Sequence, residues 1–343
     1  MDYSGALPVK EPIKLVSDAV KNGIPGAVLR IDVGGKPLVF EAFGTAKRDT
    51  IFDLASVTKC AATTTACAVL VQEGRLKLDE PVGSYLPAFA EAATPERRTV
   101  TVRELLTHTA GFPAGGAYSG KTVTLGQLVT DIARSRRTGA PGEKFLYSDF
   151  SAITLGAVVE AAAKADLRLF CREHVFGPLG MNDTGYRPGW RQIPRCAPCL
   201  PDPKDAGKVH DPTALAAERG GYVTGHAGVF STAEDLARLV PAWLGRMKFL
   251  ADPVRTEFLR EQAFGRGLGW DLSSAYSIRS GLSNTSFGHT GFTGTSIWVD
   301  PARDLSIILL TNAVFGGDAP HKACIPLRRM VSAAVAKEIP LRQ

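Results

Sequence analysis

Ser56 and Lys59 stand at i and i+3 in the stretch "DLASVTKCAATTTACAVLVQEG", residues 53 to 74, which has the composition of a helix. Residues at this spacing lie on one helix face about one turn apart. A serine hydroxyl becomes a nucleophile when a base takes its proton, and a lysine can serve if desolvation and nearby cations lower its pKa. Backbone N–H groups at the helix start would favour an oxyanion. The pair predicts acyl transfer, and a plain N-cap role for Ser56 is the structural alternative.

A second group with chemical potential is Tyr147-Ser148-Asp149, in "GEKFLYSDFSAITLGAVVEAA", which precedes a helix beginning near Phe150. A tyrosine hydroxyl at this point can shuttle a proton. Its structural alternative is a tyrosine packed at a lobe boundary with its hydroxyl satisfied. Asp149 can likewise be a simple helix N-cap.

The third group is His289-Thr290-Gly291, within the glycine-rich strand "GHTGFTGTS". Glycines in a strand permit close approach of a ligand to the backbone. His289 and Thr290 can therefore hold an anionic substrate group. The alternative is a bulged strand in which His289 is merely exposed.

The elements that must position these groups change in type along the chain. Residues 13 to 20 have helical spacing behind Pro12, and "GAVLRIDVGGKPLVFEAFG" predicts two strands joined by a hairpin at Gly34-Gly35. Helical signals dominate from Ser56 to about Leu250. Capping boxes are predicted to begin at Thr101, Thr124 and Ser231.

Strands are expected to return only near the end of the chain. "FGHTGFTGTSIWVD" and "LSIILLTNAV" are predicted to be adjacent antiparallel strands, and residues 320 to 337 a closing helix. The fold class is therefore α+β. Residues 1–55 and 265–343 would form a discontinuous lobe with an antiparallel sheet flanked by helices. Residues 56–264 would form a mainly helical lobe, and the site would lie at the interface between the two lobes.

In this order and at these separations, the three groups resemble the serine β-lactamase and penicillin-binding-protein clan, specifically its class C-like branch of carboxypeptidases, esterases and β-lactamases. The resemblance covers nearly the whole chain. Further stretches similar to this branch are "FDLASVTK", "LLTHTAGFP", "PGEKFLYSD", "FGPLGMNDTGY", "GHAGVFSTAEDLARL" and "HTGFTGTSIWVDP".

The resemblance implies a β-lactamase/transpeptidase-like fold and gives each group a role. Ser56 would be the acylated nucleophile of the S-x-x-K motif and Lys59 its base or proton relay. Tyr147 would protonate the leaving group and later activate water. The backbone N–H groups of Ser56 and Phe292, the residue after Gly291, would form the oxyanion hole.

Two positions depart from the commonest pattern of the clan. Asp149 stands where asparagine is usual, and its carboxylate should favour the protonated form of Lys59, shifting base catalysis toward Tyr147. His289 stands where β-lactamases usually have lysine. Because histidine is fully charged only below a pKa near 6.5, a β-lactam carboxylate should be held weakly at pH 7. Hydrolysis of esters or peptides is therefore expected ahead of potent β-lactamase activity.

Composition excludes several other classes of protein. The net charge of +6 comes from scattered Lys and Arg, which indicates a solvated surface rather than a nucleic-acid site. No signal peptide or membrane span is evident in the chain as given, so a cytoplasmic location is expected, or a secreted one if a leader is absent from this sequence. Cys196 and Cys199 are expected to be free thiols in a proline-bearing loop, without zinc or redox function.

The sequence thus predicts a serine hydrolase that acts through a Ser56 acyl-enzyme on small esters, D-residue peptides or β-lactams, without metal or organic cofactor. A D-alanyl-D-alanine carboxypeptidase or penicillin-binding protein is the specific alternative. A non-catalytic ligand-binding relative, with Asp149 marking a decayed site, is the alternative of another class. His108 and His226 are expected only to brace loops.

Overall fold

A five-stranded antiparallel sheet forms one side of the molecule in the computed structural model, which describes residues 9–92, 99–274 and 280–341. Its strand order is β2-β1-β8-β7-β6, and a smaller sheet has the order β3-β5-β4. The strands are β1 (Gly26–Val33), β2 (Lys36–Gly44), β3 (Phe52–Asp53), β4 (Gly185–Tyr186), β5 (Val229–Ser231), β6 (Phe287–Thr290), β7 (Ser296–Asp300) and β8 (Leu305–Thr311).

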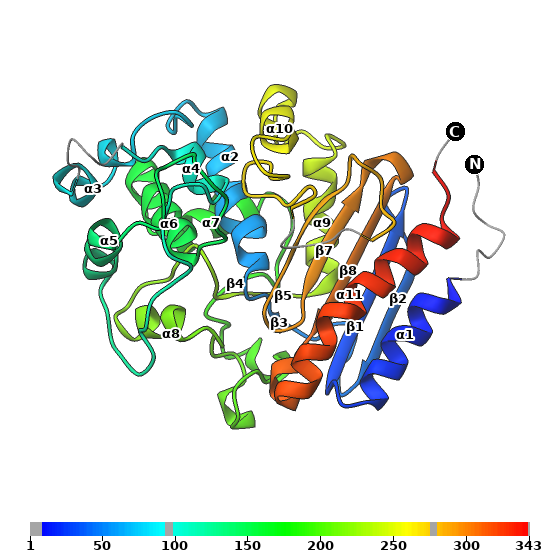
Figure 1. The fold of residues 1–343 in the computed structure, drawn as a ribbon. Helices are drawn as coiled ribbons and strands as arrows, with labels where there is room; N and C mark the ends of the chain where they lie inside the picture. Colours follow the sequence, from blue (N-terminus) through cyan, green and yellow to red (C-terminus); the bar gives the residue numbers. More distant parts are fainter. Residues whose placement is uncertain (1–8, 93–98, 275–279, 342–343) are drawn as a thin grey trace.

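The helices lie at both ends of the chain and in its middle (Figure 1). The α-helices are α1 (Lys10–Lys21), α2 (Thr65–Gln72), α3 (Pro87–Glu91), α4 (Val102–Leu106), α5 (Leu125–Arg134), α6 (Asp149–Ala163), α7 (Leu167–Cys171), α8 (Pro212–Arg219), α9 (Ala233–Trp243), α10 (Asp252–Leu259) and α11 (Asp318–Glu338). Short 3-10 or π-helical segments are η1 (Lys59–Thr64), η2 (Val82–Ser84), η3 (Arg172–Phe176), η4 (Ile193–Arg195), η5 (Pro203–Asp205), η6 (Pro301–Arg303) and η7 (Ala313–Gly316).

The two ends of the chain meet in the large sheet, as predicted. β1 pairs with β2 through the expected hairpin and with β8 on its other edge, where Ala27 lies opposite Thr311. Helices α1 and α11 lie side by side over one face (Figure 1), and apolar residues such as Val16 and Val331 share a buried cluster with Leu29 of β1. The predicted α+β class with a helix-flanked antiparallel sheet is confirmed.

Helix α9 covers the other face of the sheet, because it contacts β1 and β8. Its residues fall within 56–264, the segment expected to form the helical lobe. The middle of the chain therefore supplies both the helices of the helical lobe and the helix that packs on the second face of the sheet. Helices α2 to α7 pack with one another around the main apolar core.

Some local predictions were confirmed and others were wrong. The capping boxes at Thr101 and Thr124 are both present, whereas the third helix is capped by Thr232, which accepts from the Asp235 N–H, and not by Ser231. The stretch read as one strand before β8 is a hairpin, β6 and β7. Short strands β4 and β5 also interrupt the region from Ser56 to about Leu250, which was predicted to be mainly helical.

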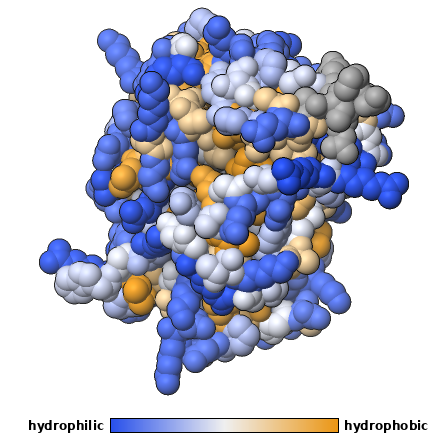
Figure 2. Space-filling view, turned by 90° about the vertical axis from the view of Figure 1, so that its left-hand side faces the viewer, coloured by the Kyte–Doolittle hydropathy of each residue, from blue (hydrophilic) through white to orange (hydrophobic). Residues whose placement is uncertain are grey.

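Apolar residues are gathered inside, and the helical side of the molecule is mostly hydrophilic, with apolar residues in small separate patches (Figure 2). None of the described helices is long and apolar enough to cross a membrane. All six cysteines are buried free thiols, as expected.

Candidate active site

The turn that carries Ser56 is held by a buried carboxylate. Ser56 lies three residues after the end of β3 and directly before the helical residues that begin at Val57, and its Oγ contacts Lys59 Nζ rather than capping a backbone N–H of the described residues. Ala55, just before it, has a positive φ of 46°, which is costly for a residue with a Cβ. Asp53 stabilises this backbone, because its Oδ1 accepts the Ala55 N–H at 2.8 Å and its Oδ2 accepts the His210 N–H at 2.7 Å. Ser56 therefore sits on a fixed, strained turn.

Lys59 connects Ser56 to the second motif. Its Nζ lies 2.8 Å from Ser56 Oγ, 2.7 Å from Asp149 Oδ1 and 3.1 Å from the carbonyl oxygen of His226. The side chain is buried, which would lower its pKa, but the charge of Asp149 and the contact with Tyr147 outweigh burial and raise the pKa above its ordinary value. Lys59 is therefore an ammonium at neutral pH, as expected from the carboxylate at position 149.

Tyr147 lies among three groups of the site. Its ring centroid is 4.6 Å from that of His108, 6.0 Å from that of His289 and 5.0 Å from Lys59 Nζ. Burial raises the pKa of the Tyr147 phenol, while Lys59 and Ser56 lower it, and the net direction is upward. The phenol is therefore neutral and can donate a proton.

The start of α6 orients Asp149 toward Lys59. Ser148 is the N-cap, because its Oγ accepts the Ser151 N–H at 3.3 Å, while its own N–H donates to His108 Nδ1 at 3.2 Å. The alternative that Asp149 is the N-cap is wrong. Its carboxylate is left for the ion pair with Lys59.

The third motif is tied to the nucleophile turn. Thr293 Oγ1 donates to the carbonyl of Asp53 at 2.7 Å and Thr295 Oγ1 to that of Leu54 at 2.9 Å. A Cβ on Gly291 would lie 2.1 Å from Thr295 Oγ1 and 2.4 Å from the carbonyl oxygen of Leu54. Only glycine permits this approach.

His289 is buried, so the alternative that it is merely exposed is wrong. Its Nδ1 lies 2.9 Å from the carbonyl oxygen of Thr290, and its Nε2 has no hydrogen-bond partner among the described residues. Burial, with the charges of Arg266 and Lys59, lowers the pKa of His289 well below the ordinary value. His289 is therefore neutral at pH 7 and cannot anchor an anion by charge.

A cavity of about 1030 Å³ opens over Ser56. Tyr147, Asp149, Thr290, Gly291 and Phe292 also line it, whereas His289 does not. The N–H groups of Ser56 and Phe292, predicted to form the oxyanion hole, donate to no carbonyl of the described chain. Apolar side chains cover most of the remaining wall, including Phe145, Leu146 and Ile325.

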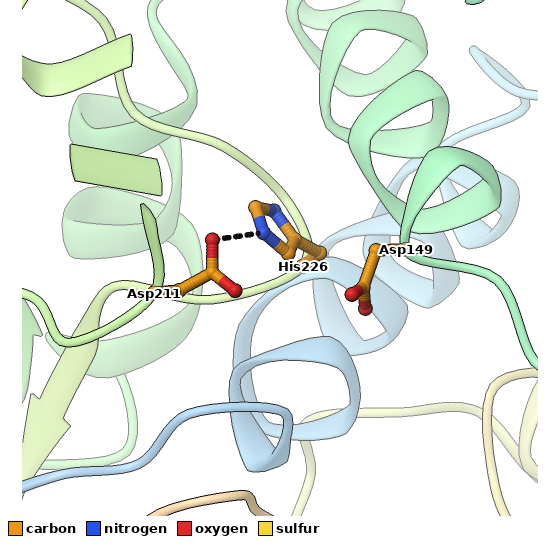
Figure 3. A group of neighbouring side chains, drawn as sticks. All are labelled: Asp149, Asp211 and His226. Atoms are coloured by element: carbon orange, nitrogen blue, oxygen red, sulfur yellow. Dashed lines mark hydrogen bonds and ion pairs between the residues drawn. The ribbon is translucent and has the colours of Figure 1, made fainter. Parts of the chain in front are cut away.

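Sequence reasoning missed the group formed by Asp211 and His226 beside Asp149 (Figure 3). Asp211 Oδ1 lies 2.8 Å from His226 Nε2, and donor atoms of all three residues lie within 4.8 Å of one another. Such a set can in principle hold a metal, but the Lys59 ammonium already pairs with Asp149 and His226 is bonded to Asp211. His226 and His108 do brace loops, as expected. His226 also contacts Lys59 through its carbonyl oxygen, and His108 packs against Tyr147, which their positions in the sequence did not predict.

Comparison with known proteins now decides the family. Residues 13–323 match the family model described as Beta-lactamase. The chain belongs to the Beta-lactamase family. It is 30% identical, over 87% of its length and 80% of the relative's, to an Escherichia coli strain K12 protein named "Putative D-alanyl-D-alanine carboxypeptidase". As a member of this family with such relatives, it is a serine hydrolase.

Solved structures of the same fold include EstCE1, a hydrolase with promiscuous acyltransferase activity. Its TM-score is 0.78 at 24% identity, covering 98% of this chain and 100% of that one. The simvastatin synthase LovD6 mutant of Aspergillus terreus has a TM-score of 0.73 at 21% identity, covering 98% and 99%. At these identities the likeness shows the Beta-lactamase family fold.

Proposed function

We propose that this Beta-lactamase family member hydrolyses small esters and D-residue peptides through an acyl-enzyme on Ser56. The observation that carries the proposal is the chain of contacts from Ser56 Oγ to Lys59 Nζ to Asp149, at 2.8 and 2.7 Å, at the floor of a cavity. β-Lactams would be poor substrates or slow inhibitors, because His289 is neutral.

Acylation begins with loss of the Ser56 proton. Lys59 is already protonated, so it can accept that proton only by passing one of its own to Asp149. The Ser56 oxygen then bonds to the substrate carbonyl carbon, and the carbonyl oxygen becomes an oxyanion bound by the N–H groups of Ser56 and Phe292. Asp149, rather than Tyr147, is the net proton acceptor, because the raised pKa of Tyr147 leaves little phenolate.

Tyr147 acts when the tetrahedral intermediate collapses. Its hydroxyl donates a proton to the leaving oxygen or nitrogen as the bond to the carbonyl carbon breaks. The proton held by Asp149 returns through Lys59 to Tyr147. Water then attacks the acyl carbon and gives its proton to Asp149 through Lys59. As the bond to the Ser56 oxygen breaks and the acid leaves, the same proton returns through Lys59 to restore the Ser56 hydroxyl.

A D-alanyl-D-alanine carboxypeptidase is the second candidate. The name of the Escherichia coli relative favours it, and Arg328 and Arg329 on α11 line the cavity, where a peptide carboxylate would need a cation. Release of D-alanine from a peptide ending in D-Ala-D-Ala distinguishes this activity from hydrolysis of simple esters.

The experiment that tests the proposal is intact-protein mass spectrometry after incubation with a short-chain p-nitrophenyl ester and, separately, a fluorescent penicillin. Wild type should gain the mass of the acyl group or release p-nitrophenol, and Ser56→Ala should do neither. The ratio of the two reactivities separates esterase from penicillin-binding behaviour. Identical behaviour of the two proteins would instead favour the non-catalytic ligand-binding relative.

A further inference from the structure

Asp211 presents a fixed carboxylate to the cavity over Ser56. It is the N-cap of α8, where its Oδ1 accepts the N–H groups of Thr213 at 2.8 Å and Ala214 at 2.9 Å. The same oxygen is bonded to His226 Nε2 at 2.8 Å. No donor of the described residues is bonded to Oδ2, and the side chain lines the cavity. One oxygen therefore fixes the orientation, and the other is available to a ligand.

The Asp211 carboxylate is charged. Burial would raise its pKa, but His226 and the backbone N–H of Ala214 lower it below the ordinary value. Its side chain is 27% exposed, so it keeps contact with the cavity while being shielded from bulk solvent. A charge in such a place interacts more strongly with a ligand than a surface charge does.

Charges divide between the two walls of the cavity. Asp149 and Asp211 come from the helical side and point toward the same space (Figure 3), whereas Arg328 and Arg329 come from α11, which covers the sheet. The Lys59 ammonium compensates Asp149 directly, at 2.7 Å. Asp211 is bonded to His226 and to two backbone N–H groups through Oδ1 alone, so the wall close to Ser56 presents a second carboxylate with its other oxygen open to a ligand.

We propose that Asp211 is a specificity-determining residue that selects substrates with an ammonium group a few bonds from the scissile carbonyl, such as α-amino esters and peptides with a free amino terminus. The inference rests on the proposed function, because the substrate must bind over Ser56. Ser56 and Asp211 line the same cavity, so a substrate bound over Ser56 can extend a group toward Asp211. An ammonium bonded to Oδ2 would satisfy the carboxylate, whereas a second anion there would be repelled.

The test compares two substrates that differ mainly in charge. Alanine ethyl ester and lactate ethyl ester, each as D- and L-forms, carry an ammonium or a hydroxyl on the same carbon. At about pH 6.5 the amine is protonated, because α-amino groups titrate near roughly 7.7–8.0. Wild type should prefer the alanine ester by about tenfold in kcat/KM, the scale of one partly shielded charge pair.

Asp211→Asn keeps an oxygen for the helix cap and for His226 but removes the charge. It should lose the tenfold preference while hydrolysing the lactate ester within about twofold of wild type. Asp166→Asn is the matched control, because Asp166 caps α7 by accepting the Leu169 N–H and does not line the cavity. It should keep the preference.

Binding to Ser56→Ala protein, measured by calorimetry, gives a readout that does not need turnover. The alanine ester should bind about tenfold more tightly than the lactate ester, and the added Asp211→Asn change should abolish the difference. Equal effects of Asp211→Asn on both esters, in turnover or in binding, would overturn the inference and leave Asp211 as a structural cap. Turnover of the lactate ester that depends on Ser56 would still support the proposed hydrolase function in that case. A binding preference for the alanine ester without turnover of either ester would overturn the proposed function but not the inference about Asp211.

Discussion

The Nζ of Lys59 lies 2.7 Å from the Oδ1 of Asp149, in an ion pair whose lysine is buried and also touches the hydroxyl of Ser56. A lysine held in this way is charged before the reaction starts, so it cannot be a simple base. The carboxylate that charges it is also the nearest group able to take its proton. In the proposed mechanism, the departure from asparagine at this position therefore changes the proton route and does not abolish it.

Asp149→Asn should lower kcat/KM for a p-nitrophenyl ester at pH 7 by about 10²- to 10⁴-fold, the range of a lost acid–base group. Without the carboxylate, burial lowers the pKa of Lys59, and neutral Lys59 becomes the base. The remaining rate should therefore rise with pH as Lys59 loses its proton. Rates of both proteins from about pH 6 to 10 check this, and an unchanged pH profile would exclude Asp149 from the relay.

Much of the fold and the catalytic core follows from local sequence. The hairpin at Gly34-Gly35, the cap at Thr101 and the neighbourhood of Ser56 and Lys59 depend on residues close in the chain. The pairing of Asp211 with His226 could not be predicted in this way. It depends on how the chain between the two residues folds back, and their separation of 15 positions matches no known motif. The burial of His289 was also missed, since strand periodicity does not tell which packed elements cover a side chain.

Tyr147→Phe should separate substrates by the quality of their leaving groups. A p-nitrophenolate leaves without a proton, so hydrolysis of its esters should fall less than about tenfold. An amine must be protonated to leave, so hydrolysis of a D-residue peptide should fall by about 10²- to 10⁴-fold. Steady-state kinetics with both substrates measure the two losses, and equal losses would mean that Tyr147 is not the acid for the leaving group.

Gly291→Ala should lower activity strongly by a steric effect, because the substitution adds only a methyl group and no charge. The added Cβ would overlap the Leu54 carbonyl and Thr295 Oγ1, which would push the third motif away from the nucleophile turn. We expect ester hydrolysis to fall by about 10²-fold or more, comparable with loss of an oxyanion donor. Gly126→Ala is the control, because its Cβ meets nothing within 4 Å in α5 and should stabilise the helix by about 0.5–1 kcal/mol. Full activity of Gly291→Ala would show that the close approach is dispensable.

Asp53 links the pH dependence of stability to the nucleophile turn. Burial, opposed by the N–H groups of His210 and Ala55, raises its pKa from 3.8 to about 6. The folded chain therefore binds this proton more tightly than the unfolded chain does. The resulting stability is fully present below the unfolded pKa and is lost as pH rises through about 6, a change of about 3 kcal/mol.

Asp53→Asn removes this titration and can accept only one of the two N–H groups through its amide oxygen. The free energy of unfolding of wild type, relative to that of the variant, should therefore fall by about 2 kcal/mol between pH 4 and pH 7. Urea unfolding of both proteins at the two pH values measures this difference, in which other titrating groups cancel. A difference independent of pH would mean that Asp53 is ionised throughout and acts on Ala55 and His210 only as a hydrogen-bond acceptor.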